Sequence, residues 1–267
     1  MSALQGVWIK VNRAKKHFHE LDAEVKAFKG RDPYLCVIDV NPQTGESTYY
    51  LKIVEHIPAE WGAILGDCIH NLRSSLDGLA YALVLANSGT PTKHTKFPIG
   101  ADRGNFAALA GASPAAIKVF SRFKTHKGGN STFNRLNDIC VIDKHRLLMP
   151  VGAVHQSYEM STVVTFGSDE PLKVSGTIPV GKARFPVKDG DILGRTSNTG
   201  AASWSAETGY ASGLPADMKM ESNFKPLLQV AFGEGQVFDG EPLVPTLKQL
   251  IDFVERVVQI FEKKFFP

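Results

Sequence analysis

The residues of this chain best suited to chemistry form one row on a predicted helix. At about 100° per residue, the members of the row fall within about 60° of His70 on a single helix face. They are Asp67, His70, Arg73, Ser74, Asp77 and Tyr81. An imidazole beside an arginine and a carboxylate can act as a general acid or base while the guanidinium binds an anionic oxygen. Residues 67–81 contain no Lys, Glu or Gln, so the row is either a functional site or a buried polar network.

A basic tetrad near the end of a later predicted helix is the second candidate. Its residues are Asp143, Lys144, His145 and Arg146. Three consecutive basic side chains cannot share one helix face, so at most two of them point into a common site. Near a helix C-terminus they also complement the macrodipole, which is a purely structural role. The tetrad gains catalytic interest only if His145 or Arg146 faces the row of the second helix.

The first predicted helix carries the third candidate, Arg13 and His17. These residues are four positions apart and can share a face. A basic amphipathic helix suits contact with phosphate groups, and an exposed basic turn is the alternative. Positive charge is also concentrated in residues 93–150, which hold ten Lys and Arg against three Asp and Glu. This distribution permits a polyanionic partner without requiring one.

The hydrophobic pattern predicts the elements that position these residues. Apolar residues at spacings of three and four indicate helices, and β-branched and aromatic runs between turn residues indicate strands. Helices are predicted at 7–29, 58–87, 102–110, 114–124, 131–148 and 243–266, and strands at 34–40, 47–55, 158–166, 171–179, 191–196 and 226–232. Ser113 precedes Pro114 and suits an N-cap. Residues 197–223, low in hydrophobicity, are predicted to form a mobile loop.

Together these elements predict an α+β fold. It is a helical bundle of about five helices with an inserted β-hairpin and a β subdomain in the C-terminal half. Residues 1–150 form the bundle, with the hairpin inserted at 34–55. Residues 151–240 form the β subdomain, and residues 241–267 form a helix that returns to the bundle.

The composition and the absence of known motifs predict where the protein is located and whether it needs a cofactor. The three cysteines are isolated and odd in number, which indicates reduced thiols in a cytoplasmic protein. No apolar stretch reaches 18 residues, so no membrane partner is expected. No CxxC, HExxH or phosphate-loop pattern occurs, so no metal site and no cofactor is predicted. Gly128-Gly129 is too short to predict a nucleotide-binding loop.

The sequence around the row resembles a family of uncharacterised bacterial proteins. In that family the helix reads G-D-x-x-H-N-L-R-S-x-L-D-H-L, and residues 66–77 match it in full. The resemblance extends to Arg13-Ala14-x-x-His17, to Ile142–Arg146 and to Pro186-Val187-x-Asp189-Gly190, in the same order. It covers most of the chain but implies no established activity.

The same helix is also similar to the HEPN helical-domain superfamily, in which many members are metal-independent ribonucleases. Their motif is an arginine, often followed by a polar residue, then four to six intervening residues and a histidine; a dimer brings two motifs together. The similarity implies an RNA-directed homodimer of a bacterial defence or toxin type. Arg73 would bind the scissile phosphate, His70 or His145 would serve as acid or base, and Asp77 would orient a histidine. The predicted substrate contacts are Arg13, His17, Lys144 and Arg146.

The chain departs from the HEPN motif at one position. Five residues beyond Arg73 stands Gly78 where the histidine is expected. Either His70 or His145 replaces that histidine, or the chain is a non-cleaving member, or the similarity is one of helices only. The alternative function is therefore a non-catalytic binding or interaction protein, in which the row is a structural network or a dimer seam. A third hypothesis, an enzyme acting on a small phosphorylated or nucleotide ligand, would need a closed pocket.

Overall fold

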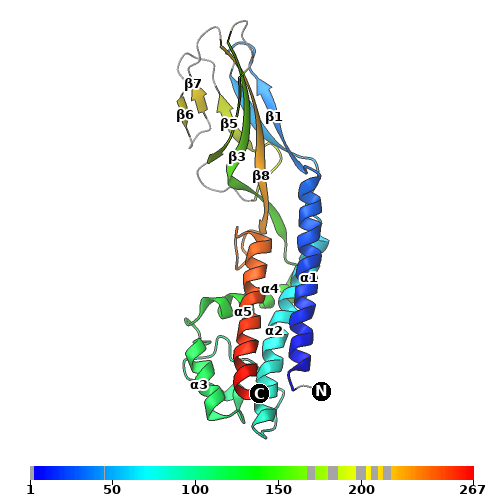
Figure 1. Ribbon diagram of the computed structural model, residues 1–267, viewed down its shortest axis with the longest axis vertical. Coiled ribbons are helices and arrows are strands. Elements are labelled where there is room, and N and C mark those ends of the chain that lie inside the picture. Colours follow the sequence, from blue (N-terminus) through cyan, green and yellow to red (C-terminus); the bar gives the residue numbers. More distant parts are fainter. Residues whose placement is uncertain are drawn as a thin grey trace. The chain divides into compact units, whose positions relative to one another are not determined.

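The computed structural model describes residues 3–44, 46–166, 172–179, 186–196, 203–205, 210–212 and 218–267. It confirms the predicted α+β fold (Figure 1). The helices are α1 (Gln5–Gly30), α2 (Glu60–Ala86), α3 (Pro114–Phe123), α4 (Ser131–His145) and α5 (Leu243–Phe265), with a short 3-10 helix η1 (Ala107–Leu109). The strands are β1 (Tyr34–Val40), β2 (Ser47–Ile53), β3 (Pro150–Phe166), β4 (Leu172–Pro179), β5 (Ile192–Thr196), β6 (Ser203–Ser205), β7 (Tyr210–Ser212) and β8 (Met218–Phe232).

The chain divides into two compact units. The helical unit contains Met1–Glu24, Ala59–Pro150 and Gly235–Pro267, and the β unit contains Val25–Pro58 and Val151–Glu234. The sequence predicts the hairpin as an insert of the bundle, whereas this division groups it with the C-terminal strands. The physical reason is strand pairing, because β2 pairs antiparallel with β5.

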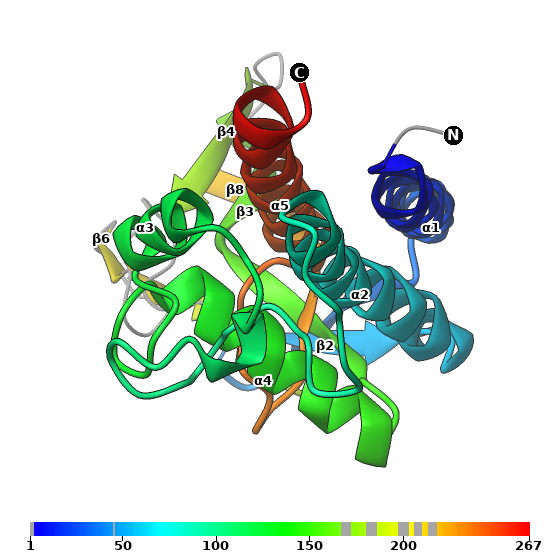
Figure 2. The same cartoon turned by 90° about the horizontal axis from the view of Figure 1, so that it is seen from below.

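Three long helices form the centre of the helical unit (Figure 2). The Trp8 indole donates to Glu262 at 2.9 Å, and Lys15 pairs with Glu255 at 2.6 Å. The residue number increases from Trp8 to Lys15 along α1 while it decreases from Glu262 to Glu255 along α5, so these two helices are antiparallel. The apolar stripe predicted for the last helix is buried throughout; it consists of Leu247, Leu250, Ile251, Val254, Val257, Val258 and Phe261. Burial of such a stripe is the main source of stability for a helix of this kind.

Two glycines of α2 allow the end of α4 to approach closely. A Cβ on Gly62 would collide with the carbonyl oxygen of Leu148, and a Cβ on Gly66 would collide with the Asp143 carboxylate. Both glycines are buried. The G-D-x-x-H motif therefore begins at a glycine that the packing of α2 against α4 requires.

Aromatic rings fill the space between α3, α4 and α5. The Phe97 ring centroid lies 4.9 Å from that of Phe120 and 5.3 Å from that of Phe133, and Phe120 lies 4.7 Å from Phe261. All four rings are fully buried. Phe97 belongs to the loop after α2, so this loop is part of the core and not a free connection.

The predicted helix boundaries are mostly right, with one clear error. Ser113 caps α3 as predicted, because its hydroxyl accepts from the backbone N–H of Ala116 at 3.2 Å. The helix predicted at 102–110 is wrong, since only η1 is helical there. Gly104, at φ +82°, breaks the segment, and Asn105 accepts from the N–H of Ala107 at 3.1 Å at the start of η1. The loop predicted at 197–223 is wrong where the structure describes it, because β6, β7 and the start of β8 lie there and β6 pairs with β7; the rest of that segment lies outside the described residues.

The β unit has two sheets. Their strand orders are β1-β2-β5-β7-β6 and β4-β3-β8. The predicted hairpin is confirmed, with Tyr34 opposite Ile53 and Val40 opposite Ser47. Its turn is held by Asn41, whose side-chain oxygen accepts from the N–H of Gln43 at 2.9 Å, the pattern of an Asx turn. Among the described helices, none combines the length and the apolar character that crossing a membrane requires.

Candidate functional site

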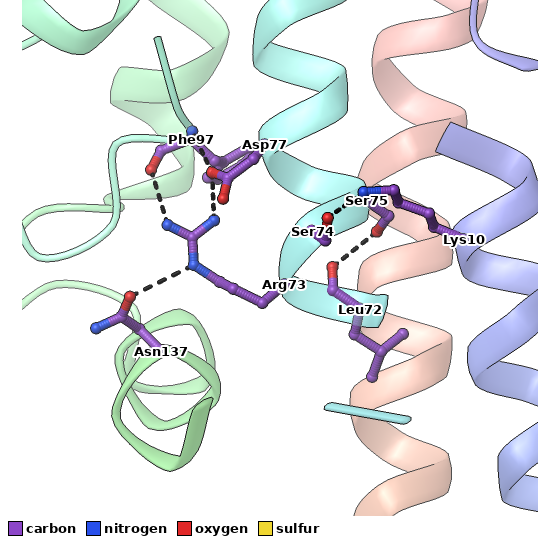
Figure 3. Close-up of polar contacts among 8 residues, drawn as sticks. All are labelled: Lys10, Leu72, Arg73, Ser74, Ser75, Asp77, Phe97 and Asn137. Carbon is purple, nitrogen blue, oxygen red and sulfur yellow. Dashed lines mark hydrogen bonds and ion pairs between the residues drawn. The ribbon is translucent and has the colours of Figure 1, made fainter. Parts of the chain in front are cut away.

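Arg73, the central residue of the predicted row, is enclosed by acceptors from three parts of the helical unit (Figure 3). Its Nη1 donates to Asp77 at 2.5 Å, its Nε to the side-chain oxygen of Asn137 at 3.4 Å, and its Nη2 to the backbone oxygen of Phe97 at 3.5 Å. Its side chain is only 11% exposed. All three nitrogens of the guanidinium therefore face groups of the chain itself.

Asp77 links the same network to the backbone of the loop after α2. Its Oδ1 accepts from Arg73 and also from the N–H of Phe97 at 2.9 Å. The Arg73–Asp77 pair thus contacts both the N–H and the carbonyl of Phe97. Because the Phe97 ring is fully buried among other phenylalanines, the pair fixes the loop at the point where it enters the core. We call Arg73, Asp77, Asn137 and the Phe97 backbone the α2 clamp.

The serines of α2 serve helix packing on the side that faces α1. The Ser74 hydroxyl is hydrogen-bonded to the Lys10 ammonium of α1, and the Ser75 hydroxyl donates to the carbonyl of Leu72 at 2.7 Å (Figure 3). About two turns earlier, the Cys68 thiol donates to the Ala14 carbonyl at 3.3 Å, and both residues are fully buried. Burial strongly raises the pKa of this thiol, so it stays protonated.

Gly78, which occupies the place of the HEPN histidine, faces α1. A Cβ at this position would lie 3.4 Å from the Cγ2 of Val7. Arg73, by contrast, reaches toward α4 and the Phe97 loop. A side chain at 78 would therefore lie on another side of α2 from the guanidinium of Arg73.

The outer part of the row lies near α4. Asp67 and His70 are exposed, and the Asp143 carboxylate packs on Gly66 beside them. Burial raises the pKa of Asp143 and the Asp67 charge adds to this, while His70 lowers it. His70 and the start of the tetrad are thus close enough to interact electrostatically. Two of the predicted clusters therefore meet here.

The rest of the tetrad follows the end of α4. Lys144 and His145 form its last turn and are exposed. Arg146 has left the helix, with φ −156° and ψ 149°, and donates to the carbonyl of Gly235 at 3.1 Å. Arg146 therefore ties the end of α4 to the segment before α5, and His145 has an open environment.

Arg13 and His17 interact with each other on α1. The Nε of Arg13 donates to the Nε2 of His17 at 3.1 Å, and the His17 Nδ1 lies 3.5 Å from the Glu20 carboxylate. An Nε2 that accepts leaves the ring proton on Nδ1, where it faces Glu20. His17 is only 8% exposed, so this predicted substrate contact is mostly covered by protein.

The fourth motif, Pro186–Gly190, forms a turn at the sheet of the β unit. Asp189 accepts from the N–H of Ile53 at 2.7 Å, and Gly190 donates to the carbonyl of Leu51 at 2.8 Å with φ +82°. The backbone hydrogen bond, followed by the contact with Lys52, lowers the pKa of Asp189. This turn extends the pairing of β2 toward β5, so the motif has a structural role.

A cavity elsewhere in the helical unit was not predicted. It has a volume of about 350 Å³ and lies between the loop 98–106 and the end of α3 with the residues after it. None of the predicted site residues lines it. Two signals pointed to this region, the positive charge of residues 93–150 and the break at Gly128-Gly129, but neither identifies a cavity whose walls come from two separate loops.

Within the part of the chain that the structure describes, no three His, Cys, Asp or Glu side chains are grouped to hold a metal ion. The polar side chains in the middle of α2, Arg73, Ser74 and Asp77, are hydrogen-bonded to other residues of this chain. Comparison with protein-family models, with curated proteins and with solved structures finds no match to this chain.

Proposed function

We propose that this chain is a non-catalytic binding or interaction protein in which the row of α2 is part of the framework of the helical unit. The observation that carries the proposal is the state of Arg73. A phosphate-binding arginine needs free N–H groups directed at its ligand, and the three nitrogens of Arg73 are directed at Asp77, Asn137 and the Phe97 backbone.

The environment of the other HEPN positions also supports the proposal. A general acid or base must reach the group that Arg73 would bind. Gly78 supplies no side chain and faces Val7, and His145 lies in an exposed last turn of α4. His70 is exposed and adjoins Asp143 instead of the guanidinium. The RNA partner and the homodimer stay predictions.

Incubation with a mixed RNA pool in the presence of a chelator tests the proposal. The proteins compared are the wild type, the Arg73→Ala variant and a His70→Ala/His145→Ala double variant. We expect no cleavage above the buffer control from any of them. We also expect Arg73→Ala to lower the free energy of unfolding by about 2 kcal/mol, because three hydrogen bonds are lost while the Asp77 carboxylate left behind is 38% exposed.

The double histidine variant is the matched control for folding. Both histidines are exposed, so removing them leaves stability within about 0.5 kcal/mol of the wild type. RNA cleavage by the wild type that this well-folded variant loses would overturn the proposal and support the ribonuclease hypothesis.

A further inference from the structure

The cavity of the helical unit is formed by two loops that are hydrogen-bonded to each other. Gly100 donates to the Thr125 carbonyl and Lys127 donates to the Ala101 carbonyl, both at 2.9 Å. The buried ring of Phe120 lines the cavity. The loops are thus tied together, and the space between them is a defined feature of the fold.

The second loop has a backbone that only glycine allows. A Cβ on Gly129 would collide with the carbonyl oxygen of Lys124, which also accepts from the N–H of Asn130 at 2.8 Å. Gly128 has φ +74°, and Lys124 itself has φ +52°. These restraints fix the loop shape before any ligand arrives, which lowers the entropic cost of binding.

Basic side chains without ion-pair partners line this cavity. Arg103, Lys124 and His126 are all part of its wall. Across the described residues, no carboxylate lies within ion-pair distance of Arg103 or Lys124. The Nδ1 of His126 is 2.9 Å from the Lys127 carbonyl, so Nδ1 carries the proton and the Nε2 of the neutral ring is an acceptor.

A threonine of the second loop lines the same space. Thr125 lines the cavity and is only 3% exposed. Its carbonyl accepts from Gly100, but its hydroxyl is hydrogen-bonded to none of the described residues. The hydroxyl is not a buried unsatisfied atom, so it is accessible from the open space and can donate to an oxygen-rich ligand there.

We propose that this cavity binds the phosphate group of a small phosphorylated ligand. Arg103 and Lys124 neutralise its charge, and the Thr125 hydroxyl donates to one of its oxygens. The volume of about 350 Å³ lies at the lower end of the range of small-molecule sites, which limits the ligand to a compact molecule. The proposal rests on the binding role proposed above and names a ligand class for it.

Two features oppose an anion in this position. Asp102 is part of the cavity wall, and the C-terminal end of α3 carries partial negative charge. Lys124, at the C-cap of α3, offsets the helix end. Two cationic side chains, Arg103 and Lys124, therefore stand against one carboxylate in the wall, and this balance favours a bound anion.

Calorimetric titration of the full chain with inorganic phosphate tests this site. Three variants are compared with the wild type. Arg103→Gln/Lys124→Asn removes both cavity charges, and asparagine tolerates the positive φ of position 124. Thr125→Val removes only the hydroxyl. Lys118→Gln/Arg122→Gln removes two charges from the same helix outside the cavity wall and is the matched control.

We expect the wild type to bind phosphate at millimolar concentration or below. The cavity double variant weakens binding at least about tenfold, Thr125→Val weakens it about threefold to tenfold, and the control stays within about twofold. Circular dichroism verifies that each variant is folded. No binding by the wild type at millimolar phosphate, or an equal loss in the control variant, would overturn the proposal.

The phosphate titration and the tests of the proposed function can fail independently of each other. Failure of phosphate binding leaves the effect of Arg73→Ala on stability unchanged. RNA cleavage that depends on His70 and His145 would overturn the binding role while leaving the phosphate titration as a separate result.

Discussion

The α2 clamp and the cavity contain the same kinds of side chain in opposite states. In the clamp, Arg73 is 11% exposed and donates to three acceptors of the chain. In the cavity, Arg103 and Lys124 line an open space, and the Thr125 hydroxyl is hydrogen-bonded to none of the described residues. Residue type alone does not distinguish a structural hydrogen-bond network from a binding site. The difference lies in whether the hydrogen-bonding groups are already used.

The largest effect expected from this comparison is on the stability of clamp variants. Asp77→Ala leaves the mostly buried guanidinium of Arg73 without its carboxylate and the Phe97 N–H without its acceptor. We expect the free energy of unfolding to fall by about 3 kcal/mol, measured by urea denaturation. His70→Ala, on the same row, is the control and changes it by no more than about 0.5 kcal/mol. Equal effects of the two substitutions would remove the distinction between the inner and outer parts of the row.

The second-largest loss of stability is expected from substitutions of the two glycines where α2 crosses the end of α4. Gly62→Ala places a methyl group against the backbone oxygen of Leu148, while Gly66→Ala meets the side chain of Asp143. A backbone oxygen cannot move without shifting the chain, whereas a carboxylate can change rotamer. We expect a loss of about 2 kcal/mol for Gly62→Ala and a smaller loss for Gly66→Ala. Thermal unfolding of both variants checks the order, and the reverse order would contradict this view of the crossing.

A smaller effect is expected at the helix that leads into the cavity. Ser113→Ala removes the N-cap of α3 and should lower stability by about 1 kcal/mol. Ser113 lies at the opposite end of α3 from Lys124, so phosphate affinity should change by less than about twofold. Urea denaturation and the phosphate titration measure the two quantities on one variant. A large loss of affinity would show that the cavity depends on the whole helix.

The smallest expected effect is the pH dependence of stability that Asp143 causes beside the outer part of the row. Burial raises the pKa of Asp143 above its ordinary value of 3.8, so the folded state holds the proton more tightly than the unfolded state does. Asp143 therefore lowers stability as the pH rises above 3.8 through its folded pKa. Asp143→Asn removes this dependence and should raise stability near pH 7 by about a few tenths of a kcal/mol, since solvent screens the group. Denaturation curves at pH 3.5 and pH 7 measure it. A decrease in stability at pH 7 would show that the charged carboxylate is favourable.

The sequence predicts much of the fold because its signals are local. The hairpin follows from β-branched runs around Asn41, and the cap of α3 follows from Ser113 before Pro114; both are confirmed. The helix predicted at 102–110 is wrong because Gly104 adopts a positive φ. Apolar periodicity cannot detect such a turn within a short segment.

The candidate site depends on contacts that the sequence cannot show. Helical spacing places Arg73 and Asp77 on one face, and the structure brings them together as predicted. The acceptors that decide their role, Asn137 and the backbone of Phe97, lie 64 and 24 residues away from Arg73. The cavity likewise depends on two loops that meet only in the folded chain. Motif spacing therefore identifies the residues of the row but does not show whether the row is a structural network or a functional site.

The most direct test of the framework role of the row is a double-mutant cycle on Arg73 and Asp77. It uses Arg73→Ala, Asp77→Ala and the double variant, with free energies of unfolding from urea denaturation. A structural clamp predicts that the double variant is much less destabilised than the sum of the single variants, with a coupling energy of about 2 kcal/mol. A coupling energy near zero, or an increase in stability on removing Arg73, would contradict the framework role and return the row to the status of a candidate active site.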